Sequence, residues 1–241
     1  MSESTRMVCG IQPVREAIAA HGAALRVMVE DRDVPQLAAL VRFAEGRGAK
    51  VERVRRGELD RASRGARHQG AVAFAPALSL RALADVPLGS DALVVVLDEI
   101  EDPQNFGAIV RSSVAFGADA IVFPEHHAAP LTSATFRASA GAVEHAKLCR
   151  EKSVGSALES LVERGVTRIG LDANATELLS ELDLRGPVAL VMGAEGKGLR
   201  KSVKGACDRL GRLPMTKTLG SLNVSAACAV ALYEVVRQRS K

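Results

Sequence analysis

The stretch LPMTKTLGSLNVSAACAVALYEVV, residues 213–236, begins as a loop and continues as the small and apolar residues of a buried helix. Ser221 stands where the N-cap of this helix is expected, because its hydroxyl could accept a free backbone N–H of the first turn. Asn223 and Ser225 follow in the predicted first turn, where polar groups and N–H donors can face a ligand. Taken alone, the stretch fits a capped structural helix equally well.

Upstream of this stretch, strands and helices alternate, which predicts a parallel sheet. The run ALVVVLDEI at 92–100 is continuously apolar, as in a strand buried on both faces. Further strands are expected at 120–125, 146–151, 167–173, 187–193 and 209–215, with helices at 105–117, 132–144, 153–165 and 198–206.

The first third of the chain predicts a smaller βαβ-rich unit. Its helices are expected at 11–21, 34–48 and 57–64, and its strands at 25–30, 50–55 and 70–76. Pro87, Gly89 and Ser90 mark a linker. The predicted organisation is therefore a small α/β domain over 1–77, a linker over 78–91 and a parallel-sheet domain over 92–241.

Composition excludes several classes of protein. No apolar run reaches the roughly 18 residues that a membrane span needs, and the N-terminus MSESTRMVCG lacks the apolar core of a secretory signal. The four cysteines are widely spaced without a CxxC pair, so no metal site is expected. These features favour a reduced, cytoplasmic setting.

Positive charge is concentrated in the first third. Residues 1–77 contain 13 Lys and Arg against 9 Asp and Glu, whereas the remainder is balanced. Eight of these cations lie between Arg47 and Arg67. A solvated surface is one interpretation, and a phosphate-binding surface is the other. The candidate RNA-binding residues are Arg53, Arg55, Arg56 and Arg64.

Two loops of the larger domain also carry candidate chemistry. DEIEDPQNFGAIVR, 98–111, puts Asn105 and Arg111 on a helix that follows a strand, and VMGAEGKGLR, 191–200, follows another strand with a glycine-rich loop. Ligands of open parallel sheets bind at such carboxyl ends. A helix cap and a surface cation are the simpler roles for the two side chains. The glycine loop matches neither a P-loop nor GxGxxG, which argues against a nucleotide-dependent oxidoreductase.

Together, three segments resemble the ordered motifs of the SpoU (TrmH-type) RNA ribose 2′-O-methyltransferases of the SPOUT superfamily. They are DPQNFGAIVRSSVAFGAD, ALVMGAEGKGLR and LPMTKTLGSLNVSAACAVALYE. MVCGIQPVREAI and RHQGAVAFAP are similar to the start and end of the family's small L30e-like RNA-binding domain. The arrangement is most similar to family members that methylate a guanosine of large-subunit (23S) ribosomal RNA.

The resemblance implies an α/β fold whose C-terminal segment forms a deep trefoil knot, although knots are otherwise nearly absent from proteins. It implies S-adenosyl-L-methionine (AdoMet) as cofactor, RNA as substrate and a homodimer. The implied catalytic set is Asn105, Arg111, Glu195, Ser221 and Asn223. The implied cofactor-binding set is Gly193, Leu213, Met215, Leu222 and Ala227. A transfer RNA substrate and a non-catalytic RNA-binding dimer are the alternatives.

Two positions depart from the family pattern. The loop PEHHAAPLT carries Glu125, His126 and His127 where basic residues are common. Lys217 stands where a glycine usually follows the Pro-Met pair. The first departure is expected to alter RNA affinity or its pH dependence, and the second is expected to alter the geometry of the cofactor loop and to put a cation beside the RNA entrance.

Overall fold

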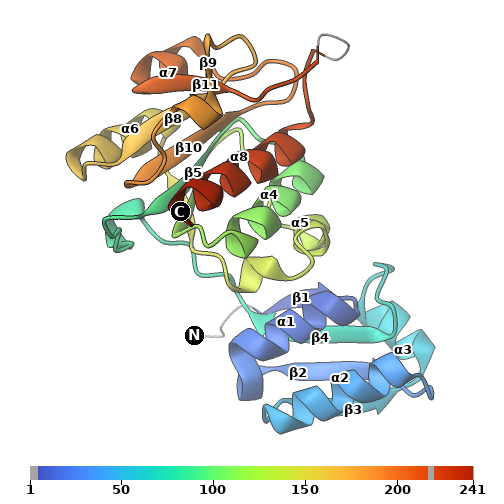
Figure 1. Ribbon diagram of the computed structural model, residues 1–241. Coiled ribbons are helices and arrows are strands. Elements are labelled where there is room, and N and C mark those ends of the chain that lie inside the picture. Colours follow the sequence, from blue (N-terminus) through green and yellow to red (C-terminus); the bar gives the residue numbers. More distant parts are fainter. Residues whose placement is uncertain (1–4, 217–219, 241) are drawn as a thin grey trace. The chain divides into compact units, whose positions relative to one another are not determined.

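The computed structural model describes residues 5–216 and 220–240 (Figure 1). By its internal contacts the chain forms two compact units. Unit 1 comprises Met1–Ser79 with Leu131–His145, and unit 2 comprises Leu80–Pro130 with Ala146–Lys241. Residues 131–145, which the sequence analysis assigned to the second domain, thus pack with the N-terminal part of the chain.

Unit 1 is built on a four-stranded sheet with the order β1-β4-β2-β3. Only β2 and β3 are parallel, and β4 runs antiparallel to both of its neighbours. Its elements are β1 (Thr5–Cys9), α1 (Ile11–His21), β2 (Arg26–Glu30), α2 (Pro35–Gly46), β3 (Lys50–Val54), α3 (Arg56–Ala62) and β4 (Ala71–Pro76). The predicted helices and strands are confirmed, whereas β1 was missed.

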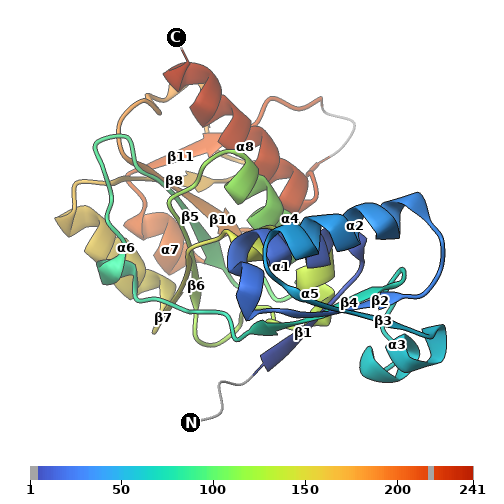
Figure 2. The same ribbon diagram turned by 90° about the horizontal axis from the view of Figure 1, so that it is seen from below.

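The sheet of unit 1 is covered on both faces, and its side chains alternate accordingly. Val27 and Val29 belong to a core shared with α1 and α2. Met28, between them, belongs to a separate cluster that contains Leu59 of α3. Successive strand residues point to opposite faces, so the alternation directs α1 and α2 to one side and α3 to the other (Figure 2).

Residues 131–145 complete unit 1. They form α5 (Ser133–Ala138), which contacts β1, and a 3₁₀ turn at Ala142–Glu144, which contacts α1. The Glu144 side chain is fully buried; it accepts a hydrogen bond from Arg6 and lies 3.0 Å from His21 Nε2. The single helix predicted at 132–144 is wrong, because Ala140 and Gly141 adopt positive φ values of 50° and 88°.

Unit 2 contains a seven-stranded parallel sheet with the order β7-β6-β5-β10-β8-β11-β9. The strands are β5 (Leu93–Asp98), β6 (Ala120–Pro124), β7 (Leu148–Glu151), β8 (Thr167–Leu171), β9 (Glu177–Leu178), β10 (Val188–Gly193) and β11 (Arg209–Arg212). The helices are α4 (Pro103–Ala115), α6 (Val154–Glu163), α7 (Lys201–Ala206) and α8 (Val224–Arg239). The predicted α/β fold with a parallel sheet is confirmed, and only the short β9 was missed.

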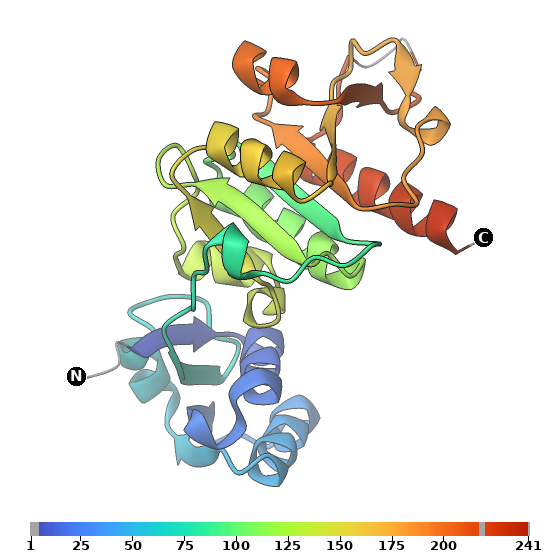
Figure 3. The ribbon, with the colours of Figure 1, turned by 90° about the vertical axis from the view of Figure 1, so that its left-hand side faces the viewer.

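Helices cover both faces of this sheet (Figure 3). Val94 and Val96 pack with the apolar side of α6. On the opposite face, Phe106 of α4 meets Phe123 of β6 edge to face, with 5.2 Å between ring centroids. There α8 contacts both α4 and β10. Because β5 and β10 are central and completely buried, their ends provide a rigid base for the loops that follow.

The segment predicted as a linker is partly ordered by unit 2. The Arg81 N–H donates to Leu148 O at 3.0 Å, and the Arg150 N–H donates to Arg81 O at 3.2 Å. The predicted knot depends on the path of residues 213–223, of which 217–219 lie outside the described residues, so the knot stays a prediction. No helix in the described part of the chain is long and apolar enough to cross a membrane.

Candidate functional site

The glycine loop after β10 turns so tightly that it requires a glycine at its first position. An added Cβ at Gly193 would lie 2.2 Å from both Gly198 C and Leu199 N. The Gly198 N–H closes the loop by donating to Ala194 O at 2.8 Å, and Gly196 and Gly198 take positive φ values of 77° and 66°. Residues 193–198 therefore form a tight hydrogen-bonded turn, of which residues 195–198 are exposed.

A buried carboxylate fixes the far end of this loop. Asp98, the last residue of β5, pairs in register with Gly193 and is fully buried. Its Oδ2 accepts from the Arg200 backbone N–H at 3.0 Å, and its Oδ1 accepts from Arg200 Nε at 2.8 Å. The hydrogen bond to Asp98 raises the pKa of Arg200 above its usual range. Such charge-assisted bonds hold the loop against the sheet edge.

Three predicted catalytic residues form one hydrogen-bonded network. Asn105 Nδ2 donates to Glu195 Oε2 at 3.0 Å, and Asn223 Nδ2 donates to Asn105 Oδ1 at 2.9 Å. A third, longer contact of 3.4 Å joins Asn223 Nδ2 to Glu195 Oε2. The three side chains come from α4, the glycine loop and the start of α8, so the network connects segments that are distant in the sequence.

The N-cap of α8 is Asn223, and the prediction that Ser221 caps this helix is wrong. Asn223 Oδ1 accepts from the backbone N–H groups of Ser225 and Ala226, at 3.0 and 3.4 Å. One amide side chain thus caps α8 through its oxygen and joins the polar network through its nitrogen. The α4 helix is capped in the same way by Asp102, whose Oδ2 accepts from the Asn105 N–H at 2.9 Å.

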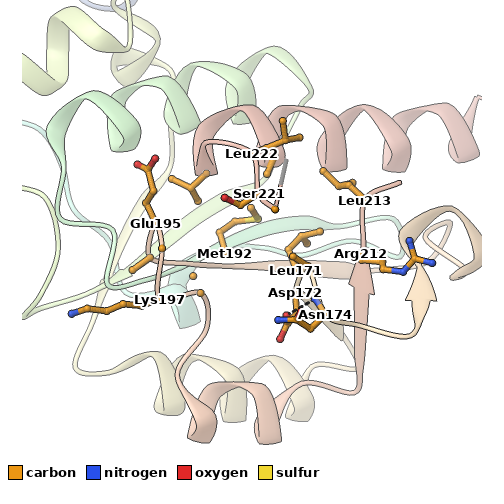
Figure 4. Close-up of a pocket in the computed structure, with 18 of the residues that line it drawn as sticks. Leu171, Asp172, Asn174, Met192, Glu195, Lys197, Arg212, Leu213, Ser221 and Leu222 are labelled. Atoms are coloured by element: carbon orange, nitrogen blue, oxygen red, sulfur yellow. Dashed lines mark hydrogen bonds between the residues drawn. The ribbon is translucent and has the colours of Figure 1, made fainter. Parts of the chain in front are cut away.

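A cavity of about 470 Å³ lies beside this network (Figure 4). Its lining contains every residue predicted to bind the cofactor, together with the predicted catalytic residues Glu195 and Ser221: Gly193, Leu213, Met215, Leu222, Ala227, Glu195 and Ser221. The lining combines backbone of the glycine loop with apolar side chains. This volume is typical of small-molecule sites, which range from about 300 to 1,000 Å³.

The opposite wall of this cavity contains polar residues that the sequence analysis missed. Asp172, Asn174 and Lys204 all line it. Lys204 forms an ion pair with Asp172, and this hydrogen bond lowers the pKa of the Asp172 carboxyl below its usual value. The position of Asp172 directly after β8 was the available signal, because polar residues at strand ends had already identified the other loops.

A second cavity of about 540 Å³ adjoins the first. Both are lined by Ala194, Glu195, Lys197 and Val224, and the second also contains Asn105. His127 lines it as well, with its Nδ1 3.1 Å from Glu101 Oε1. Glu195 therefore stands at the wall that the two cavities have in common.

The remaining predicted residues lie elsewhere. Arg111 is exposed on α4 and lines neither cavity of unit 2, and Lys217 lies outside the described residues. Of the predicted RNA-binding arginines, Arg56 lines a cavity in unit 1, and Arg53, Arg55 and Arg64 do not line that cavity. Within residues 5–216 and 220–240, no group of His, Cys, Asp or Glu is arranged to hold a metal ion.

Two family models match the chain. The SpoU rRNA Methylase family matches residues 92–233, and the RNA 2′-O ribose methyltransferase substrate binding family matches residues 7–80. A protein of Mycobacterium sp. (strain KMS), named an uncharacterized tRNA/rRNA methyltransferase, is 38% identical over 248 residues, covering 99% of this chain and 78% of its own length. The Bacillus subtilis protein YacO, named a putative TrmH family tRNA/rRNA methyltransferase, is 35% identical over 246 residues, covering 100% of this chain and 98% of its own.

Solved structures have the same fold. An RNA 2′-O ribose methyltransferase superposes with a TM-score of 0.83 at 28% identity, covering 100% of this chain and 91% of its own. The SpoU methyltransferase AviRb from Streptomyces viridochromogenes, solved with AdoMet, superposes with a TM-score of 0.81 at 24% identity, covering 98% and 91%. The cavity beside the glycine loop has the volume of a small-molecule site, and it is lined by apolar side chains and by residues of the glycine loop. The chain belongs to the SpoU family of AdoMet-dependent RNA methyltransferases.

Proposed function

We propose that the protein methylates a ribose 2′-hydroxyl of ribosomal RNA, with a guanosine of 23S rRNA as target. The observation that carries this proposal is the shared wall of the two cavities at Glu195. We assign the cavity beside the glycine loop to AdoMet and the adjoining cavity to the target ribose. A methyl group at the shared wall would then lie beside an incoming hydroxyl, which is the positioning that in-line transfer requires.

In this proposal AdoMet supplies an electrophilic methyl group, and the protein orients the hydroxyl that attacks it. Two amides donate hydrogen bonds to Glu195 Oε2, which fixes the carboxylate at the shared wall. Glu195 and Asn105 offer acceptor and donor atoms that can position the ribose. The Arg111 side chain forms no hydrogen bond or ion pair with another described residue, so its guanidinium is available to an RNA phosphate. It then acts as a phosphate clamp while water takes the proton of the hydroxyl, or it acts as the base itself if its own proton becomes mobile.

The homodimer is part of the same proposal. Helix α8 buries Cys228, Ala231 and Leu232 inside unit 2, yet it exposes Val230 by 45% and Tyr233 by 55%. Ala226 is exposed on the same side, so the spacing of 226, 230 and 233 makes an apolar stripe along the outer face. A second copy of the chain covering this stripe would remove it from water.

Ribosomal RNA is favoured over transfer RNA by the two-domain layout and by the wording of the family description, whereas the relatives' names allow both substrates. The cytoplasm, where both RNAs are found, is the proposed location. A non-catalytic RNA-binding role is disfavoured because the candidate catalytic residues are all present and three of them form one network.

The experiment uses unmodified transcripts of ribosomal and transfer RNA with methyl-labelled AdoMet, followed by alkaline hydrolysis. Cleavage by alkali needs a free 2′-hydroxyl, so we expect label in an alkali-resistant dinucleotide from 23S rRNA whose 5′ nucleotide is one guanosine. Label recovered in single nucleotides after alkaline hydrolysis would show that a base is methylated, and this result would overturn the 2′-O proposal. Label in transfer RNA alone would overturn the ribosomal assignment, and the Glu195→Gln variant serves as the low-activity control.

A further inference from the structure

Unit 1 has a cavity of its own, which the site in unit 2 does not use. Its volume is about 760 Å³, and it lies where the loop of residues 65–70 meets the loops before α1 and α2. Three arginines line it, namely Arg32, Arg56 and Arg67. We call this cavity the basic groove.

The arginines of the basic groove have no protein partner. Among the described residues, the side chains of Arg32, Arg56 and Arg67 form no hydrogen bond or ion pair. Several other guanidinium groups of unit 1 are engaged: Arg26 with Glu52 at 2.8 Å, Arg53 with Asp31 at 3.9 Å, and Arg61 with Gly57 O at 3.1 Å. Unpaired guanidinium groups around one cavity leave their donors to an anionic ligand.

The wall of the basic groove is preformed. His68 is buried; its Nδ1 accepts from the Gly70 N–H at 3.0 Å, which leaves Nε2 to donate to Asp60 Oδ1 at 2.9 Å. Gly70 takes a φ of 85°, and its carbonyl accepts from the Glu30 N–H at 2.8 Å. Such a loop loses little conformational freedom when a ligand binds.

The lining also limits which anion fits. Two carboxylates, Glu30 and Asp60, line the groove beside the arginines, so the ligand must supply hydrogen-bond donors as well as negative charge. RNA meets both requirements, because its phosphates accept from arginine and its 2′-hydroxyls donate to carboxylates. No Phe, Tyr or Trp is among the lining residues, and His68 is held in the wall by its hydrogen bonds to Gly70 and Asp60.

We propose that the basic groove holds the sugar–phosphate backbone of the RNA substrate and distinguishes RNA from DNA. Arg32, Arg56 and Arg67 bind phosphates, while Glu30 and the free oxygen of Asp60 accept hydrogen bonds from ribose 2′-hydroxyls. The inference rests on the proposed function in taking RNA as the substrate. It moves the predicted RNA surface away from Arg53, Arg55 and Arg64, which do not line the groove.

The test measures binding of a fluorescein-labelled RNA hairpin, and of the DNA hairpin of the same sequence, to the full chain by anisotropy at several salt concentrations. The groove variant replaces Arg32, Arg56 and Arg67 by alanine. The matched control replaces Arg53, Arg55 and Arg64 by alanine, which removes the same charge outside the groove. Circular dichroism and AdoMet binding verify that each variant folds.

Three lost phosphate contacts should reduce the slope of log K against log salt by about 2, since each contact to a single strand contributes about 0.7. Between roughly 50 and 200 mM salt, the wild-type affinity should therefore fall about 20-fold more than that of the groove variant. The control should keep most of the wild-type slope. An equal reduction in both variants, or an unchanged slope in the groove variant, would overturn the proposal.

The Glu30→Gln variant tests the recognition of ribose separately. A neutral amide is a weaker acceptor than a carboxylate, so the preference for RNA over DNA should decrease by a few-fold, roughly as for one hydrogen bond of about 1 kcal/mol. An unchanged preference would remove the ribose contact from the proposal. With saturating ribosomal RNA, the groove variant should have the wild-type kcat and a raised KM. If the proposed function itself were wrong, the wild type would give no 2′-O-methyl product, so the two failures can be told apart.

Discussion

The cofactor cavity of unit 2 depends mainly on the backbone, whereas the basic groove of unit 1 depends mainly on side chains. The cofactor cavity depends on a backbone turn, which Gly193 allows and the Asp98–Arg200 pair fixes. The basic groove depends on charged side chains that stand free around a preformed loop. Backbone-built sites are sensitive to a single added methyl group, whereas a side-chain-built site should lose its ligand in steps as its charges are removed.

The largest expected effect comes from Gly193→Ala. The new Cβ would lie 2.2 Å from backbone atoms of Gly198 and Leu199, so the loop must leave its position. We expect AdoMet binding and methyl transfer to be lost, by at least about 10²-fold, because misplacing groups by about 1 Å already has that effect. Isothermal titration calorimetry with AdoMet measures the loss.

Gly205→Ala in α7 is the matched control for this substitution, because nothing lies within 4 Å of its added Cβ. It should bind AdoMet as the wild type does. If Gly193→Ala bound AdoMet with wild-type affinity, the cofactor cavity would not depend on the backbone turn at Gly193. The contrast between the two cavities would then disappear.

A smaller effect is expected from separating the two roles of Asn223. Asn223→Asp keeps an oxygen that caps α8 but removes the amide that donates to Asn105 and Glu195. Asn223→Ala removes both roles and should also lower the free energy of unfolding by about 1 kcal/mol. Both variants should lose methyl transfer on the order of 10²-fold, since the network no longer fixes Glu195.

Urea denaturation and single-turnover assays distinguish the two roles of Asn223. Ser221→Ala is the stability control, since Ser221 does not cap the helix. Wild-type turnover in Asn223→Asp would show that the network is dispensable, and Asn223 would then be only a helix cap.

The smallest expected effect concerns pH and the Asp172–Lys204 pair. The pKa of Asp172 is lower in the folded protein than its ordinary value of about 3.9, so the pair stabilises the protein above that pH. This stabilisation, on the order of 1 kcal/mol, should be lost as the pH falls below about 4. Denaturation of wild type and Asp172→Asn from pH 8 to 3 should give a constant difference down to about pH 5 and a shrinking difference below it. A difference that grows towards low pH would contradict the sign of this pKa shift.

Much of this arrangement could be predicted from the sequence because strand-end motifs specify a backbone-built site. Gly193 ends a strand that the apolar run identifies, Glu195 follows it, and both line the cofactor cavity. The N-cap of α8 could not be chosen, because Ser and Asn are similarly favoured and stand two residues apart. In the structure Asn223 takes this place, where its Oδ1 caps α8 and its Nδ2 donates to Asn105.

The basic groove could not be predicted in the same way. The arginines between residues 47 and 67 look alike in the sequence, and their availability depends on which carboxylates the fold brings near them. Arg26 meets Glu52 only because β2 and β3 pair in parallel. Arg32, which lies outside the basic cluster, joins the groove only because the loop after β2 lies beside the loop of residues 65–70.

The packing of residues 131–145 with unit 1 has a consequence for the order of synthesis. The ribosome makes β1 to β4 first, but α5 and Glu144 emerge only after β5, α4 and β6 have been made. Until then Arg6 lacks the carboxylate that it binds, and β1 lacks the helix that it contacts. Unit 1 therefore cannot complete its fold co-translationally before unit 2 has begun, and a fragment that ends at residue 79 is expected to be an unfinished domain.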